Sequence, residues 1–447
     1  MRRVLMIAFY TFPAAEVGAR RTDRFARYLP RFGWEPVVLT VKEKYYSRCE
    51  TAEQSLGSTY IARTYAPMPL VWYHNRKLQR CRGRESHRSE PYATPVIHRT
   101  SSPRFSLRSQ IAQGLQVPDE FNGWIPFGVW EGWKLIRRFQ PALIYASAKP
   151  VSAHVIGWFL KKLTGLPLVI DFRDIWVGNP WDVEQPLWVK QWKMAIERRL
   201  IRDADRIILN TPHALAIYRQ RYSCIPQDRF ICIPNGYDET DIESGDITTL
   251  SQTDSRDPTV LIVHTGTVYG RMDPRALLQA VREVTHGSVT ARKSLRIEFY
   301  GTYEIQVDGK SFAELVSDYH LGHLVRLNPP VPRAKALQLQ RRADALLLFV
   351  PETDVAVPAK TYEYIVARRP ILALCSPLSA TAQVIRETQT GVVIEPQNVD
   401  AIKSALEEVI LGAIGYSPDE SAVGRYNAVY LTQQLSQVFG SIVGQNT

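Results

Sequence analysis

Cysteine and long apolar runs are scarce in this sequence. Its 447 residues include five cysteines, odd in number and scattered, with no C-x-x-C pair and no Cys/His cluster. Disulfide frameworks and zinc sites need such spacing, so neither is indicated, and a reducing cytoplasm is the expected location. No run of about eighteen apolar residues occurs, so no transmembrane helix is predicted.

Several catalytic signatures are also missing. The sequence has no GxxxxGK[ST] loop, no recognisable Ser/His/Asp set and no pair of acids at metal-binding spacing. Asp171 and Asp174 are three residues apart and do not form an Asp-x-Asp pair. We therefore expect no essential metal ion and no cofactor.

Positive charge, by contrast, is abundant. The formal net charge is +11, which favours an acidic partner such as nucleic acid, anionic lipid or a phosphorylated ligand. Between His74 and Arg108, nine Lys or Arg residues stand against two acids. An anionic membrane surface is the predicted partner of this stretch, and a solvated loop without a partner is the alternative. No RNP-like, zinc or helix-turn-helix pattern accompanies the charge, so nucleic acid ranks last.

The length and the order of apolar patterns predict two α/β domains. Short apolar runs, typical of buried parallel strands, alternate with helical patterns through 1–240 and again through 259–424. The polar stretch 241–258 reads as a linker, and 66–117 interrupts the alternation as a basic insertion. The tail, 425–447, has an apolar face and is predicted to be helical. Each half begins with a strand, a loop and a helix in the order typical of a Rossmann-like fold.

The stretch Val357–Leu374 organises the second half. Pro358 suits the start of a helix through Ala367, and Pro370 ends it before a buried strand. Lys360 and Glu363, three residues apart, share one face of that helix. A helix start favours anions, so the lysine could serve a phosphate and the carboxylate the hydroxyls of a ribose. The alternative is a solvated Lys–Glu pair on a surface helix.

Two stretches resemble a known family. The run E-Y-I-V-A-R-R-P-I-L-A, from Glu363 to Ala373 with Pro370 seven residues after the glutamate, resembles the second half of the Glu-x7-Glu signature of retaining glycosyltransferases of family 4. Residues 141–176, PALIYASAKPVSAHVIGWFLKKLTGLPLVIDFRDIW, resemble a βαβ unit of a bacterial subgroup found in surface-polysaccharide assembly. The chain departs from the family at Val355, where the first glutamate of the signature would stand.

The resemblance implies a fold and a set of site residues. The fold is GT-B: two Rossmann-like domains face each other across a cleft, and the C-terminal helix crosses back to the N-terminal domain. The N-terminal domain, 1–240, would take the acceptor, and the domain 259–424 would take the donor. The residues expected to bind the donor are Gly18, Gly266, Thr267, Arg271, Lys360, Tyr362 and Glu363. The expected catalytic residues are Asp174, Arg173 and His154, the last with a structural role as the alternative.

The resemblance also implies an activity. A hexosyl-type transferase would move a sugar, with retention, from a nucleotide-diphosphate sugar to a lipid-linked or saccharide acceptor. It would be cytoplasmic and peripheral at the inner face of the cell membrane. The alternative is a non-catalytic sugar-nucleotide-binding or partner protein of the same fold, which the valine at position 355 favours.

Overall fold

The structure is a computed structural model. It describes residues 1–49, 57, 59–67, 113–179, 185–240, 259–270, 272–286, 294–350 and 355–444. The chain forms two compact units, one comprising Met1–Pro234 with Leu431–Thr447 and the other Asn235–Tyr430. The predicted linker, 241–258, and the basic stretch from His74 to Arg108 lie outside the described residues.

The first unit is built on a parallel sheet. Its strand order is β3-β2-β1-β4-β5-β6-β7, with every neighbouring pair parallel. The strands are β1 (Arg2–Ala8), β2 (Trp34–Val41), β3 (Tyr60–Thr64), β4 (Leu143–Ser147), β5 (Leu168–Phe172), β6 (Arg206–Leu209) and β7 (Phe230–Cys232). The central strands β4 and β5 are buried throughout, which explains their unbroken apolar sequence.

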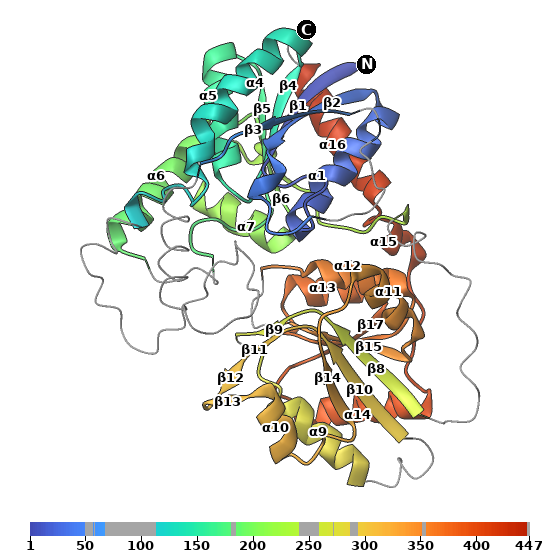
Figure 1. Ribbon diagram of the computed structural model, residues 1–447. Helices are drawn as coiled ribbons and strands as arrows, with labels where there is room; N and C mark the ends of the chain where they lie inside the picture. The colour runs from blue at the N-terminus through green and yellow to red at the C-terminus, as the bar shows by residue number, and fades with distance from the viewer. Residues whose placement is uncertain are drawn as a thin grey trace. The chain divides into compact units, whose positions relative to one another are not determined.

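Helices cover both faces of this sheet (Figure 1). They are α1 (Val17–Tyr28), α4 (Ile125–Phe139), α5 (Ser152–Thr164), α6 (Leu187–Asp203), α7 (Pro212–Arg221) and α16 (Ala428–Val443). Glycines let α4 approach α5 closely: a Cβ at Gly128 would lie 2.5 Å from Ile156, and one at Gly132 would lie 2.5 Å from Leu160. The α4–α5 pair therefore forms a compact layer on one side of the sheet.

The C-terminal helix α16 completes the core of the first unit. Its apolar face is buried with residues of α1, β1, β2 and β4 in one cluster. The ring of Phe439 lies 5.2 Å from that of Trp34 and 5.9 Å from that of Tyr145, measured between centroids. The predicted return of the last helix to the first half is thus confirmed.

The second unit has a six-stranded parallel sheet in the order β14-β10-β8-β15-β16-β17. The strands are β8 (Thr259–Thr265), β10 (Ser294–Tyr300), β14 (Val325–Asn328), β15 (Ala345–Phe349), β16 (Ile371–Leu374) and β17 (Gly391–Ile394). Two small ladders accompany it, β9 (Val268–Tyr269) with β11 (Tyr303–Glu304) and β12 (Gln306–Val307) with β13 (Lys310–Ser311). Two parallel-sheet α/β units in one chain confirm the predicted fold class.

Two separate cores lie on the two faces of the second sheet. One contains residues of α9 (Arg275–His286), α10 (Phe312–Asp318) and α14 (Val399–Leu411). The other contains residues of α11 (Arg333–Arg342), α12 (Ala359–Ala367), α13 (Ala380–Thr388) and α15 (Glu420–Gly424). The helix and strand predicted within Val357–Leu374 are α12 and β16.

We predict that Phe439→Ala destabilises the first unit, although position 439 is remote from it in sequence. Truncating a buried aromatic ring costs about 3–5 kcal/mol of unfolding free energy. Denaturant unfolding should show the loss, and amide hydrogen exchange should rise in β1 and β4. The exposed Gln437 lies in the same helix, and Gln437→Ala should change the unfolding free energy by less than about 0.5 kcal/mol. Equal stability of the two variants would contradict the role assigned to α16.

Candidate functional site

Each sheet has one place where the strand order reverses. In the first unit the chain builds β1, β2 and β3 in one direction and then returns to β4 beside β1. In the second it builds β8, β10 and β14, then returns to β15 beside β8. Ligands of open α/β sheets bind beyond the carboxyl ends of the strands at such points. The two reversals are therefore the places to search for a site.

In the second unit, a glycine with a positive φ angle follows β8. Gly266 has φ +120°, a conformation that residues with a Cβ rarely adopt. Its N–H donates to the carbonyl of Tyr300 at 2.8 Å. A Cβ at this position would lie 2.7 Å from Nζ of Lys360. The structure thus brings together two predicted donor-site residues that are almost a hundred positions apart in sequence.

Lys360 lies in the first turn of α12, where burial controls its charge. Burial lowers the pKa of Lys360 to about 8, and the carboxylate of Glu363 opposes that shift. Its Nζ is 3.5 Å from Nε2 of His264, the penultimate residue of β8. The lysine is therefore not the solvated member of a surface Lys–Glu pair that the alternative interpretation supposed.

Glu363 has a partner that the sequence did not reveal. Oε1 of Glu363 lies 3.2 Å from Nε of Arg333, the first residue of α11, and both side chains are about one-quarter exposed. The carboxylate is thus fixed from a neighbouring helix while it keeps access to solvent. Arg333 gives no periodic or motif signal, and only the packing of α11 beside α12 identifies it.

The remaining predicted residues of this unit differ in position. Thr267 Oγ1 lies 2.9 Å from Oγ1 of Thr302, next to Gly266. Tyr362 is 1 % exposed, with its ring 5.4 Å from that of Tyr426, and this burial favours a packing role. Arg271 lies outside the described residues.

Two further side chains, missed in the sequence, hold the end of β8. The Tyr364 hydroxyl accepts a hydrogen bond from the backbone N–H of Thr265 at 2.8 Å. Gln340 Nε2 donates to Oγ1 of Thr265 at 2.8 Å. All three residues are buried. The loop that carries Gly266 is therefore anchored by helices α11 and α12.

In the first unit, the reversal brings Gly18 and Arg173 together. A Cβ at Gly18 would lie 3.2 Å from an NH1 nitrogen of Arg173. The other guanidinium nitrogens of Arg173 donate to Oγ of Ser147 at 3.1 Å and to Oγ1 of Thr22 at 2.8 Å. Helix α1, the end of β4 and the loop after β5 thus meet at one guanidinium group.

A buried ion pair supports this arrangement. Arg21 Nε donates to Oδ2 of Asp171 at 2.8 Å and its NH2 to Oδ1 at 3.1 Å. Tyr145 also donates to Oδ2, at 2.5 Å. Burial acts to raise the pKa of Asp171, but the charge and hydrogen bonds of Arg21 hold it below its usual value. Asp171 is consequently a fixed anion under the site, not a proton donor.

The other two predicted catalytic residues have different surroundings. Asp174 is partly exposed, with Oδ2 3.1 Å from Nζ of Lys149. His154 is fully buried, and its Nε2 lies 3.1 Å from the carbonyl oxygen of Asp171. Burial lowers the pKa of His154 to about 4, so its ring is neutral. The structure favours the structural interpretation of His154.

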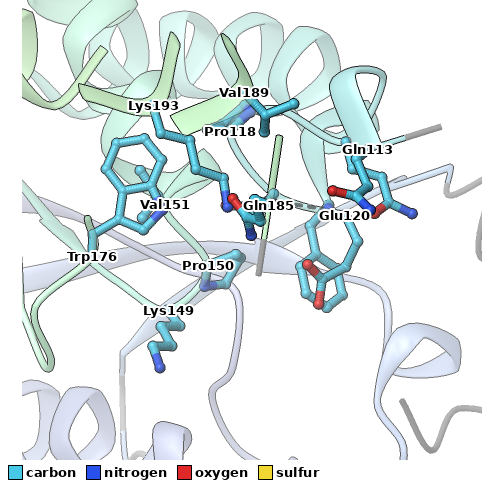
Figure 2. Close-up of a pocket in the computed structure, with 13 residues that line it drawn as sticks. Gln113, Pro118, Glu120, Lys149, Pro150, Val151, Trp176, Gln185, Val189 and Lys193 are labelled. Atoms are coloured by element: carbon cyan, nitrogen blue, oxygen red, sulfur yellow. Dashed lines mark hydrogen bonds between the residues drawn. The ribbon is translucent and has the colours of Figure 1, made fainter. Parts of the chain in front are cut away.

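A cavity of about 400 Å³ opens near Asp174 in the first unit. Sequence reasoning did not assign it. Figure 2 shows residues from the loops after β4 and β5 and from α6 around it. Its lining includes two cations, several amides and an indole: Lys149, Lys193, Gln113, Gln116, Gln185 and Trp176. Asp119, also in the lining, caps α5 by accepting from the N–H and hydroxyl of Ser152.

Within the described ranges, no three or more His, Cys, Asp or Glu side chains gather where they could hold a metal ion. None of the described helices is long and apolar enough to cross a membrane.

Comparison with known proteins identifies the class. Residues 18–236 match the family described as "Glycosyl transferase 4-like domain". No curated protein matches the sequence significantly. The predicted resemblance to family 4 is confirmed for this part of the chain, and a glycosyltransferase of the GT-B type is the class that this match and the fold together support.

Solved structures share the fold along nearly the whole chain. Sucrose-phosphate synthase from Thermosynechococcus elongatus is 16% identical, with a TM-score of 0.61 and coverage of 100% of both chains. Anabaena HepE, solved with UDP and glucose, is 13% identical, with a TM-score of 0.58 and coverage of 99% and 100%. The lipopolysaccharide outer core galactosyltransferase WaaB is 11% identical, with a TM-score of 0.57 and coverage of 98% and 99%.

We predict that Lys360 is labelled by amine-reactive reagents at unusually low pH. Its pKa of about 8 leaves about half of its side chains neutral and nucleophilic at pH 8. Peptide mass spectrometry across pH 6.5–10.5 should place its labelling midpoint near 8. Lys310 is the internal control, because its hydrogen bond to Asp318 raises its pKa above the ordinary value. Coincident midpoints for the two lysines would show that Lys360 is solvated.

Proposed function

We propose that this protein transfers a hexosyl-type sugar, with retention, from a nucleotide-diphosphate sugar to an acceptor. The observation that carries the proposal is the cluster of Gly266, Lys360 and Glu363 at the strand reversal of the second unit. HepE, of the same fold, was solved with UDP-glucose. A nucleotide-diphosphate donor supplies both groups that this cluster suits, an anionic diphosphate and a ribose.

Each group of the cluster has one role in the proposal. The ammonium of Lys360 and the positive end of the α12 dipole stabilise the charge that develops on the leaving diphosphate. Because Gly266 has no side chain, the diphosphate of the donor and the side chain of Lys360 can both lie close to its backbone. Glu363, held by Arg333, accepts hydrogen bonds from the ribose hydroxyls. Thr267, next to Gly266, belongs to the proposed donor site, and Arg271, four positions further along the sequence, is proposed to complete it.

The first unit supplies the proposed acceptor side. Arg173 and Asp174 follow β5, and the 400 Å³ cavity is lined by Lys149, the ion-pair partner of Asp174. Amide side chains and an indole are suited to the hydroxyls and apolar faces of a saccharide. A saccharide acceptor, free or lipid-linked, is therefore the proposed occupant of the cavity.

A second candidate function is a non-catalytic sugar-nucleotide-binding or partner protein. Val355 stands where the family's first glutamate would, and the ion pair with Arg333 already engages Glu363. Turnover of UDP-, GDP- and dTDP-sugars with an acceptor present separates the two candidates. Binding of a nucleotide sugar without turnover would favour the second.

We predict that Glu363→Ala abolishes turnover and weakens donor binding while the protein stays folded. Loss of a hydrogen bond to a charged group costs about 1.5–3 kcal/mol, which is tenfold or more in the dissociation constant. Isothermal titration with the donor sugar nucleotide measures the change. Glu408→Ala, at an exposed position of α14, is the matched control. Near-normal donor affinity and rate in Glu363→Ala would refute the ribose role.

We also propose that the enzyme is peripheral at an anionic, cytoplasmic membrane face. The basic stretch from His74 to Arg108 is one contributor. Helix α4 is a second, because its exposed Trp130 stacks on Trp133 at 5.5 Å and carries Lys134 over its ring. Tryptophan prefers the headgroup level, and each basic residue near an anionic surface adds about 1 kcal/mol.

We predict that the protein co-sediments with vesicles containing anionic lipid and that salt weakens this binding, since the Debye length is about 8 Å at physiological ionic strength. Changing Arg76, Arg80, Arg82 and Arg84 to glutamine should reduce binding about a hundredfold or more. Trp130→Ser with Arg137→Gln tests the helical contribution.

The control for charge alone is Lys335→Gln with Arg342→Gln, at exposed positions of the second unit. This pair should leave vesicle binding unchanged. Equal binding to neutral vesicles, or no binding at low salt, would show that the basic stretch is a loop without a membrane partner.

A further inference from the structure

His264 is a buried titratable residue to which neither the family signature nor the proposed mechanism gives a role. It is 0 % exposed, near the carboxyl end of β8. Its Nδ1 lies 2.9 Å from the carbonyl oxygen of Leu347 in β15, and its Nε2 lies 3.5 Å from Nζ of Lys360. A single imidazole ring therefore joins the sheet to the cation of the proposed donor site.

The strand reversal explains the first of these contacts. Strands β8 and β15 pair through Ala345 with Ile262 and Leu346 with Val263, and the register ends there. The next carbonyl along β15, that of Leu347, receives the imidazole N–H. The side chain of His264 thus supplies the hydrogen bond just beyond the last backbone pair, at the point where the two strands diverge.

The same contact fixes the tautomer. The ring has backbone hydrogen bonds with Leu347 and Gly266, and a carbonyl oxygen only accepts, so we assign the proton to Nδ1 from its 2.9 Å contact with Leu347; Nε2 then presents its lone pair to Lys360. Burial first, and the charge of Lys360 second, lower the pKa of His264 well below its usual value, so the ring is neutral. A neutral acceptor orients the ammonium group and leaves its charge intact. A carboxylate in the same place would cancel that charge.

We infer that His264 is the positioning residue for Lys360: its Nε2 lone pair holds the ammonium group beside Gly266, aimed at the diphosphate of the donor. This inference rests on the proposed function. His264 acts through Lys360 and does not itself contact the donor. It is therefore distinct from Glu363, which serves the ribose.

The positioning has a defined pH dependence. Among the described residues, the groups that face Lys360 are His264 of β8 and Glu363 of α12, with Arg333 of α11 paired to that carboxylate. Diphosphate binding needs the protonated lysine, so affinity is full below pH 8 and falls up to tenfold per pH unit above it. Loss of the Nε2 acceptor removes a stabilising partner of the ammonium form, so the fall should begin at lower pH.

Two variants separate the two contacts of the ring. His264→Asn keeps an N–H group near Nδ1 for the carbonyl of Leu347 and removes the acceptor near Lys360. His264→Gln places its amide near Nε2 and removes the contact with Leu347. We measure dissociation constants for UDP and GDP by isothermal titration from pH 6.5 to 9.5, the labelling midpoint of Lys360 and the melting temperature of the full chain.

We expect His264→Asn to melt close to the wild type and to bind nucleoside diphosphate about tenfold more weakly at pH 7. The pH above which its affinity falls and the labelling midpoint of Lys360 should both be lower than in the wild type. We expect His264→Gln to melt lower and yet restore most of the affinity and the midpoint. A merely structural histidine would make affinity follow melting temperature in both variants.

The outcomes distinguish this inference from the proposed function. A wild type that binds neither UDP nor GDP would refute the donor site, and the labelling midpoint would still test the effect of His264 on Lys360. A wild type that binds, together with an Asn variant of unchanged affinity, pH limb and midpoint, would overturn the positioning role and leave the donor site intact. Failure of the Asn variant to fold, with a Gln variant that folds but does not restore the midpoint, would also overturn it.

Discussion

Both units depend on one constraint: backbone polar groups at the end of a parallel sheet need partners where neighbouring strands diverge. A buried backbone group that is left unpaired costs about 1–3 kcal/mol. In each unit, polar side chains form hydrogen bonds with the backbone groups that lie beyond the last strand pair. The imidazole of His264 serves the carbonyl of Leu347, and the hydroxyl of Tyr364 serves the N–H of Thr265. The groups that complete the sheet therefore also build the site.

The first unit satisfies the constraint with a charged group. Arg21 bridges Asp171 at the end of β5 and the carbonyls of Ile233 and Pro234 after β7. Removal of one partner of a buried ion pair costs about 3–5 kcal/mol, because the other charge is left without compensation. This rigidity keeps Arg173, two residues beyond Asp171, beside Gly18 at the start of α1. The same contacts thus stabilise the first unit and determine the geometry of its site.

Charge is distributed differently in the two candidate sites. In the second unit, Lys360 is half-buried, and its pKa of about 8 leaves it partly neutral until an anion arrives. A bound diphosphate would restore the full charge, so donor binding would take up a proton at alkaline pH. In the first unit, Asp174 and Lys149 form a partly exposed pair beside the cavity. This pair is accessible to polar groups of the proposed acceptor.

Local sequence determined much of this protein. Proline at positions 358 and 370 set the limits of α12, and continuous apolar runs identified β16 as a buried strand. The two α/β halves and the return of the last helix also followed, because apolar periodicity reports which face of an element is buried. The spacing of Lys360 and Glu363 placed both on one helix face, and so indicated the candidate donor site.

Tertiary structure alone decided which partners these residues have. Arg333, His264 and Tyr364 lie far from Lys360 and Glu363 in sequence or carry no motif, so no local pattern could indicate them. The burial that favours packing roles for His154 and Tyr362 was equally hidden, because a single side chain does not report which neighbours cover it. Sequence fixes the face on which a residue lies through helical and strand periods. Which residues become the neighbours of that face depends on the order in which the strands cross over in the sheet. This order is determined only when the sheet assembles.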